Sequence, residues 1–88
     1  MKITDVRVRL VKEELKLKAI ASITFDECFV VHDIKVIEGK DGLFISMPNK
    51  KTGENEHKDI AHPIKTETRQ EIKDAVLDAY NKALQEQA

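Results

Sequence analysis

Residues 17–37 read LKAIASITFDECFVVHDIKVI. Two segments rich in β-branched residues, 17–25 and 29–37, are separated only by the three residues DEC. β-Branched residues favour strands, and a separation of this length is typical of a tight hairpin. The sequence therefore predicts two adjacent strands joined by a short turn.

The sequence on either side of this hairpin predicts further strands. Residues 4–11 alternate apolar and charged side chains with the period of two that a strand with one buried face requires. Glycines bracket the break at 38–42, and LFISM at 43–47 follows as a fourth strand. A short fifth strand is expected at 59–64, DIAHPI, where Pro63 confines it to a sheet edge or ends it.

From residue 66 the apolar period changes from that of a strand to that of a helix. Thr68 and Glu71 have capping-box spacing, and Asp78 and Lys82 form a favourable i, i+4 pair. These signals predict one helix over about 66–84. Its apolar stripe follows the spacing i, i+3, i+4, i+7, i+8 and i+11 and consists of Ile72, Ala75, Val76, Ala79, Tyr80 and Ala83.

Length and composition bound the class of protein. Eighty-eight residues make a single domain, 1–88. The expected fold class is α+β, with a small antiparallel sheet of about five strands over residues 3–62 and one C-terminal helix over 66–84. A single thiol, Cys28, in a charged chain without tryptophan indicates a reducing, cytoplasmic environment. No apolar run approaches the ~18 residues of a transmembrane helix, so no membrane contact is expected.

The sequence contains more apolar residues than one covered sheet face can bury. A chain this short buries only roughly 60–65 % of the surface that it exposes when unfolded. We therefore expect a homodimer in which the second subunit covers the surplus. The surplus comprises Ile20 against Ile23 and Phe25 in the second strand, Val30, Ile34 and Val36 against Phe29, Val31 and Ile37 in the third, and Leu77 with Leu84 on the helix.

The residue types that carry catalysis occur without the spacing that catalysis needs. His32 and Asp33 are neighbours in a predicted strand and should point to opposite faces, so His32 is expected to be a core histidine with its hydrogen bonds satisfied. Cys28, His57 and His62 lack the spacings of a zinc site. No glycine-rich phosphate loop is present in the sequence. We therefore expect no enzyme, no metal and no cofactor.

Residues 47–53, MPNKKTG, interrupt the apolar pattern with a proline, two adjacent lysines and a glycine. The formal net charge of −1 argues against a non-specific nucleic-acid binder, because neutralisation of phosphates supplies the affinity of such proteins. Nucleic-acid binding would need a local basic patch. Lys50 and Lys51 are either such a patch or an ordinary solvated hairpin tip.

The segments KAIASITF, FVVHDIKVIEGKDGLFISMPNK, DIAHPI and TRQEI, in this order and spacing, resemble the SpoVG family of bacteria (stage V sporulation protein G, also called septation protein SpoVG). The resemblance runs from about Ile3 to Tyr80. It implies a dimeric α+β domain and a regulator linked to sporulation and formation of the division septum in spore formers. In other bacteria it implies control of gene expression through site-specific binding of DNA and also of RNA. The basic residues that bind nucleic acid in the family correspond to Lys50 and Lys51, with Lys58 on the returning strand.

Lysine stands at positions 51 and 58 of this sequence, where arginine is frequent in the family. Arginine grips guanine or phosphate through two parallel hydrogen bonds, whereas lysine is a point charge, so phosphate contact is favoured over base readout. Arg7 and Arg9, on the outer face of the first strand beside Asp5, extend the predicted patch. The alternative is a protein-interaction module that binds a protein partner in septation or sporulation, which fits the near-neutral charge and the scarcity of aromatic residues for stacking.

Overall fold

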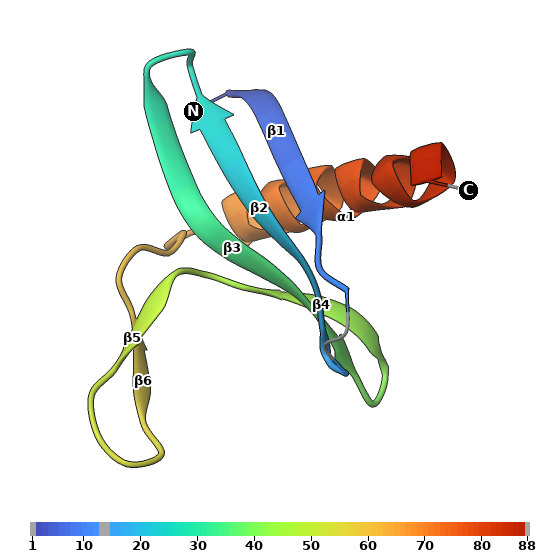
Figure 1. The fold of residues 1–88 in the computed structure, drawn as a ribbon. Helices are drawn as coiled ribbons and strands as arrows, with labels where there is room; N and C mark the ends of the chain where they lie inside the picture. Colours follow the sequence, from blue (N-terminus) through green and yellow to red (C-terminus); the bar gives the residue numbers. More distant parts are fainter. Residues whose placement is uncertain (1, 13–14, 88) are drawn as a thin grey trace.

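The structure is a computed structural model and describes residues 2–12 and 15–87, without the side chain of Gln87. Over this part of the chain the strands β1 to β4 form one antiparallel sheet in the order β1-β2-β3-β4, and β5 and β6 form a separate two-stranded hairpin (Figure 1). The predicted α+β class, with an antiparallel sheet and a C-terminal helix, is confirmed. The elements are β1 (Ile3–Leu10), β2 (Leu17–Phe25), β3 (Phe29–Gly39), β4 (Gly42–Ser46), β5 (Asn49–Lys51), β6 (His57–Asp59) and α1 (Thr66–Gln87).

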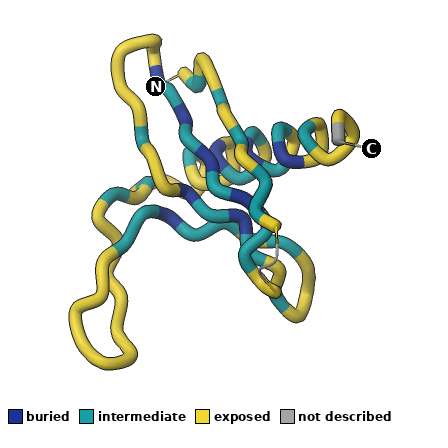
Figure 2. Tube along the Cα trace, viewed as in Figure 1, coloured by how far each residue is buried: buried dark blue, intermediate teal, exposed yellow. Residues whose placement is uncertain are grey.

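The core lies between α1 and one face of the four-stranded sheet. Figure 2 shows the buried residues along the middle strands and on the helix. Alternate residues of β2 are buried because one face of that strand is turned toward α1. The core cluster consists of Ala19, Ala21, Ile23, Phe25, Ile34, Val36, Met47, Ile72, Val76 and Tyr80.

The apolar stripe predicted for α1 is confirmed, but the predictions for its N-terminal cap and for Leu77 are wrong. The helix begins at Thr66, so Thr68 lies inside the first turn and is not the cap that the sequence predicted. The pair Lys82–Asp78 forms as expected, with 3.5 Å between Nζ and Oδ2. Leu77, which the sequence placed off the stripe, packs against the core cluster.

A β-bulge in β3 changes which face its residues occupy. The register of β2 against β3 shifts near the middle of both strands, and Asp33 has a φ of 63°. This left-handed conformation is uncommon outside glycine, although aspartate adopts it more readily than most residues. The extra residue reverses the alternation, so Val31 and Ile34 both pack toward the core while Val30 is exposed. The prediction that Val30 shares a face with Ile34 is wrong because it assumed uninterrupted alternation.

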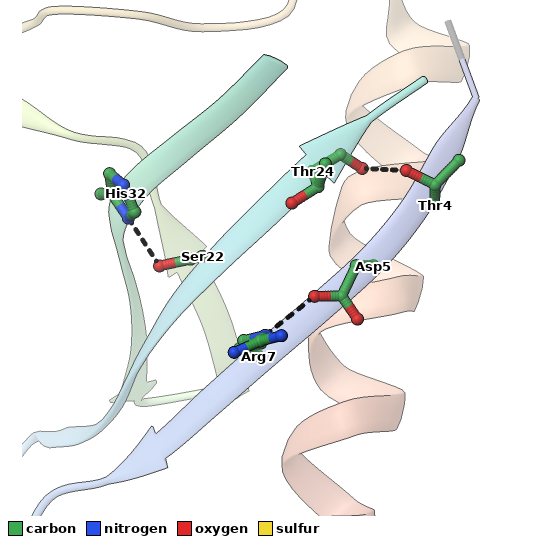
Figure 3. Close-up of polar contacts among 6 residues, drawn as sticks. All are labelled: Thr4, Asp5, Arg7, Ser22, Thr24 and His32. Carbon is green, nitrogen blue, oxygen red and sulfur yellow. Dashed lines mark hydrogen bonds and ion pairs between the residues drawn. The ribbon is translucent and has the colours of Figure 1, made fainter. Parts of the chain in front are cut away.

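The same bulge brings His32 to the outer face of the sheet. His32 is exposed, and its Nδ1 lies 3.0 Å from Oγ of Ser22 (Figure 3). The prediction of a core histidine is therefore wrong. His32 and Asp33 both line one hollow on this outer face, which a regular strand would not allow.

The fifth predicted strand is displaced. Strand β6 ends at Asp59, and residues 60–65 form bends and irregular chain before α1. The sequence reading missed β5, which pairs with β6. A small separate hairpin thus replaces the expected fifth strand at 59–64. Pro63, which has no N–H to donate to a sheet ladder, lies in the irregular segment.

Candidate nucleic-acid interface

The three lysines predicted to bind nucleic acid lie on the β5–β6 hairpin, which projects away from the large sheet and from α1 (Figure 1). Every residue from 50 to 60 is exposed (Figure 2). The tip is closed by a hydrogen bond of 2.9 Å that the Thr52 N–H donates to the carbonyl oxygen of Glu56. The hairpin therefore presents its side chains to solvent on a defined backbone.

The hairpin begins just after a buried core residue, and local hydrogen bonds order its base. Met47 is buried in the core, and its carbonyl oxygen accepts a hydrogen bond of 2.8 Å from Nδ2 of Asn49. On the other arm, the Ile60 N–H donates to the carbonyl oxygen of Pro48 at 2.7 Å. These bonds order the base of the hairpin and join its two arms.

The register of β5 and β6 decides which lysines act together. Lys50 lies directly opposite Lys58, and Lys51 lies directly opposite His57. Residues directly opposite each other share one face of a hairpin, and neighbours along a strand alternate between faces. Lys50 and Lys58 thus form a pair on one face, and Lys51 lies with His57 on the other. The sequence reading had grouped Lys50 with Lys51 and had missed His57.

The Lys50–Lys58 pair carries an unfavourable charge interaction. Two like charges directly opposite each other destabilise a hairpin by roughly 0.2–1 kcal/mol. Within the described residues, the ion pairs involve Arg7, Lys18 and Lys82, and neither member of this hairpin pair. An anion between the two ammonium groups would relieve their repulsion, and phosphate is an anion that lysine binds as a point charge.

Arg7 and Arg9 belong to a different surface. They lie on β1, and the hairpin continues from β4 at the opposite edge of the sheet. Four strands span about 14 Å from the first strand to the last. The two arginines line a hollow together with Ser22 and His32, and Nε of Arg7 donates to Oδ2 of Asp5 at 3.0 Å.

The predicted site residues therefore fall into two groups, the hairpin lysines and the arginines of the sheet face. Sequence reasoning missed Ser22 and His32 as members of the second group. The bulge that brings His32 to this face is made by one residue of β3, and the alternation rule gave no sign of it. The role of either group in binding stays a prediction.

In the part of the chain that the structure describes, no group of three or more His, Cys, Asp or Glu side chains is placed to hold a metal ion. Cys28 is exposed at the turn between β2 and β3. Among the described residues, no helix is long and apolar enough to cross a membrane.

A helix-covered antiparallel sheet with a projecting, charged hairpin defines a small α+β protein. The SpoVG family model matches residues 1–82. The chain belongs to the SpoVG family, which confirms the resemblance seen in its sequence.

Similar curated proteins carry the same name. The chain is 67 % identical over 84 residues to the "Putative septation protein SpoVG" of Clostridioides difficile (strain 630), which covers 96 % of this chain and 91 % of that protein. It is 60 % identical over 88 residues to the protein of that name in Thermoanaerobacter sp. (strain X514), over 100 % of this chain and 96 % of the relative. The Clostridium perfringens (strain 13 / Type A) protein of that name is 63 % identical over 82 residues, with coverage of 93 % and 91 %.

Proposed function

We propose that this protein is a regulator that binds nucleic acid site-specifically through the β5–β6 hairpin. Its setting would be septation, the process in the names of its relatives, together with sporulation, which the family resemblance implies. The observation that carries the proposal is the Lys50–Lys58 pair, two like charges held opposite each other on an exposed hairpin. A phosphate group would turn this unfavourable pair into a favourable contact.

A homodimer is part of this proposal. Phe29, Ile60 and Ile64 are 61 %, 67 % and 89 % exposed. They adjoin an apolar hollow of about 140 Å³ to which residues 61–63 contribute. A second copy placed against this end of the molecule would bury these side chains. A two-fold axis would then present two hairpins at a fixed separation, as symmetric nucleic-acid-binding proteins do.

The direct test compares Lys50→Ala/Lys58→Ala with the parent protein in nucleic-acid titrations at several salt concentrations. The variant should fold normally because both side chains are exposed. Each phosphate contact contributes about −0.9 to the log–log slope of affinity against salt, so the slope should flatten by up to about 1.8 per chain. Lys73→Ala/Lys82→Ala removes the same charge from α1 and serves as the matched control. An unchanged slope in the hairpin variant would remove the hairpin from the binding site.

A protein-interaction module that acts in septation is the second candidate. The apolar hollow beside the exposed Phe29 is the observation that favours it. Binding through such a surface should barely respond to salt, whereas binding to phosphates must weaken steeply as salt rises. The same titration series therefore separates the two functions.

A further inference from the structure

The outer face of the four-stranded sheet, turned away from α1, is hollowed. Over β1, β2 and β3 lies an open hollow of about 620 Å³. This volume falls within the range of roughly 300–1,000 Å³ that is usual for small-molecule sites. Figure 3 shows Arg7, Ser22 and His32 on this face, with the helix behind the sheet. The lining residues are Arg7, Val8, Arg9, Ile20, Ser22, His32 and Asp33.

One end of the hollow is suited to a phosphate group. Arg7 and Arg9 are two residues apart on β1, so they share a face at a spacing of about 7 Å. Arginine binds phosphate through two parallel hydrogen bonds, and two long side chains at this spacing can converge on one group. Lys35 adds a third cation to this face, because it lies opposite Ile20, which itself lies opposite Arg9.

The other end of the hollow is suited to a base and a sugar. The hydrogen bond between Nδ1 of His32 and Oγ of Ser22, at 3.0 Å, joins the imidazole ring on β3 to the side chain of Ser22 on β2. A planar ring on an open sheet face is a surface on which an unpaired base stacks, and Ile20 supplies apolar contact beside it. The carboxylate of Asp33 accepts hydrogen bonds, which base amino groups and ribose hydroxyls donate.

The negative charges at the hollow argue for a nucleotide over a bare anion. Asp33 lines the hollow and Asp5 pairs with Arg7, so both carboxylates repel an inorganic phosphate. A nucleotide offsets that repulsion, since its base and sugar make contacts that inorganic phosphate lacks. The arrangement of cations, a planar ring and an acceptor therefore matches the phosphate, the base and the hydroxyl or amino groups of one nucleotide.

We propose that this hollow binds a nucleotide, with the phosphate on Arg7 and Arg9 and the base against His32. The nucleotide is either free or one unit of a single strand, because a duplex hides its bases in the stack. The single-strand form rests on the nucleic-acid binding proposed above, whereas the free-nucleotide form does not. Hairpin and sheet face would then be two separate contacts for the same class of ligand.

The test titrates the ¹⁵N-labelled full chain with four probes: 5′-AMP, inorganic phosphate, a single-stranded oligonucleotide and the duplex of the same sequence. Amide shifts should move in β1, β2 and β3 with 5′-AMP and with the single strand, and inorganic phosphate should bind at least about tenfold more weakly than 5′-AMP. Equal binding of inorganic phosphate and 5′-AMP would show an anion site only and would overturn the proposal. Shifts confined to the hairpin would overturn it as well.

Variants separate this inference from the proposed function. Arg7→Gln/Arg9→Gln and His32→Gln should each weaken 5′-AMP and single-strand binding by about tenfold or more and leave duplex binding unchanged. The charge-matched control Lys73→Gln/Lys82→Gln on α1 should bind as the parent does. If the parent binds oligonucleotides and the sheet-face variants bind them equally well, the inference fails and the hairpin proposal stands. If only 5′-AMP binds, and at this hollow, the inference holds in its free-nucleotide form and the proposed function fails.

Discussion

The backbone conformation of Asp33 decides which side chains of β3 face the core and which face solvent. Its φ of 63° forms the bulge that turns Val31 and Ile34 toward the core and His32 toward solvent. Left-handed backbone costs an ordinary residue roughly 1–2 kcal/mol, and least for glycine, asparagine and aspartate. Bulges occur preferentially beside functional sites, where they re-aim a side chain. At this position the re-aimed side chain is that of His32.

Replacement of Asp33 tests the bulge. Asp33→Val should lower the free energy of unfolding by roughly 1–2 kcal/mol, because a β-branched side chain is poorly tolerated at positive φ. Asp33→Asn should change it little, since asparagine adopts the left-handed region readily. Urea unfolding measures both variants. Equal stability of the valine and asparagine variants would mean that the chain does not depend on this conformation.

Among the elements, the sequence predicted the helix and the strands that have a regular apolar pattern. It missed the features that depend on one inserted residue or on pairing between strands. The burial of Ile72, Val76 and Tyr80 followed from helical spacing, and four strands followed from period two and β-branched composition. The sequence could not predict which face of the sheet His32 lies on, because one inserted residue reverses the alternation of faces without altering the composition of the strand. Strand β5 reads NKK and has no apolar pattern, so its extended form depends on pairing with β6.

The like-charge pair of the hairpin predicts a conflict between stability and binding. Lys50→Glu replaces repulsion with attraction to Lys58 and should hold or raise the melting temperature, by an amount equivalent to a few tenths of a kcal/mol. The same change should weaken nucleic-acid binding, because it puts a negative charge where a phosphate is proposed to sit. Thermal unfolding and titration of one preparation measure both effects. Unchanged affinity with the glutamate would contradict the role of Lys50.

Helix α1 is predicted to be integral to the fold. Val76 is 0 % exposed and Leu84 is 43 % exposed, so the two residues form a matched comparison on one helix. Val76→Ala should lower the free energy of unfolding by about 2–3 kcal/mol, through lost burial and the cavity left behind. Leu84→Ala should cost clearly less. A melting temperature unchanged by Val76→Ala would mean that the helix does not pack on the sheet as described.

In the whole molecule, the charged surfaces and the exposed apolar surface lie on different elements. Helix α1 carries five acidic and three basic residues, whereas the β5–β6 hairpin carries three lysines against Glu54, Glu56 and Asp59, and β1 carries Arg7 and Arg9 against Asp5. The helix therefore repels anionic ligands more than the hairpin or the outer sheet face does. The apolar hollow near Phe29 is a third surface, and a partner bound there would leave the hairpin and the outer sheet face open.

The homodimer prediction rests on the exposed apolar surface near Phe29. Light scattering at micromolar concentration should give twice the 10.0 kDa of the chain, because a domain this small gains stability when a second copy covers Phe29 and Ile64. Phe29→Asp/Ile64→Asp should shift the protein to monomer, while Leu15→Asp, at a residue that is 90 % exposed and lies in the segment between β1 and β2, should not. A monomeric parent would contradict the prediction directly. A double variant that stays dimeric would keep the dimer and move its interface away from Phe29. In a dimer built at this end, the monomeric variant should also bind duplex with a flatter salt slope than the parent, because each molecule then presents one hairpin instead of two.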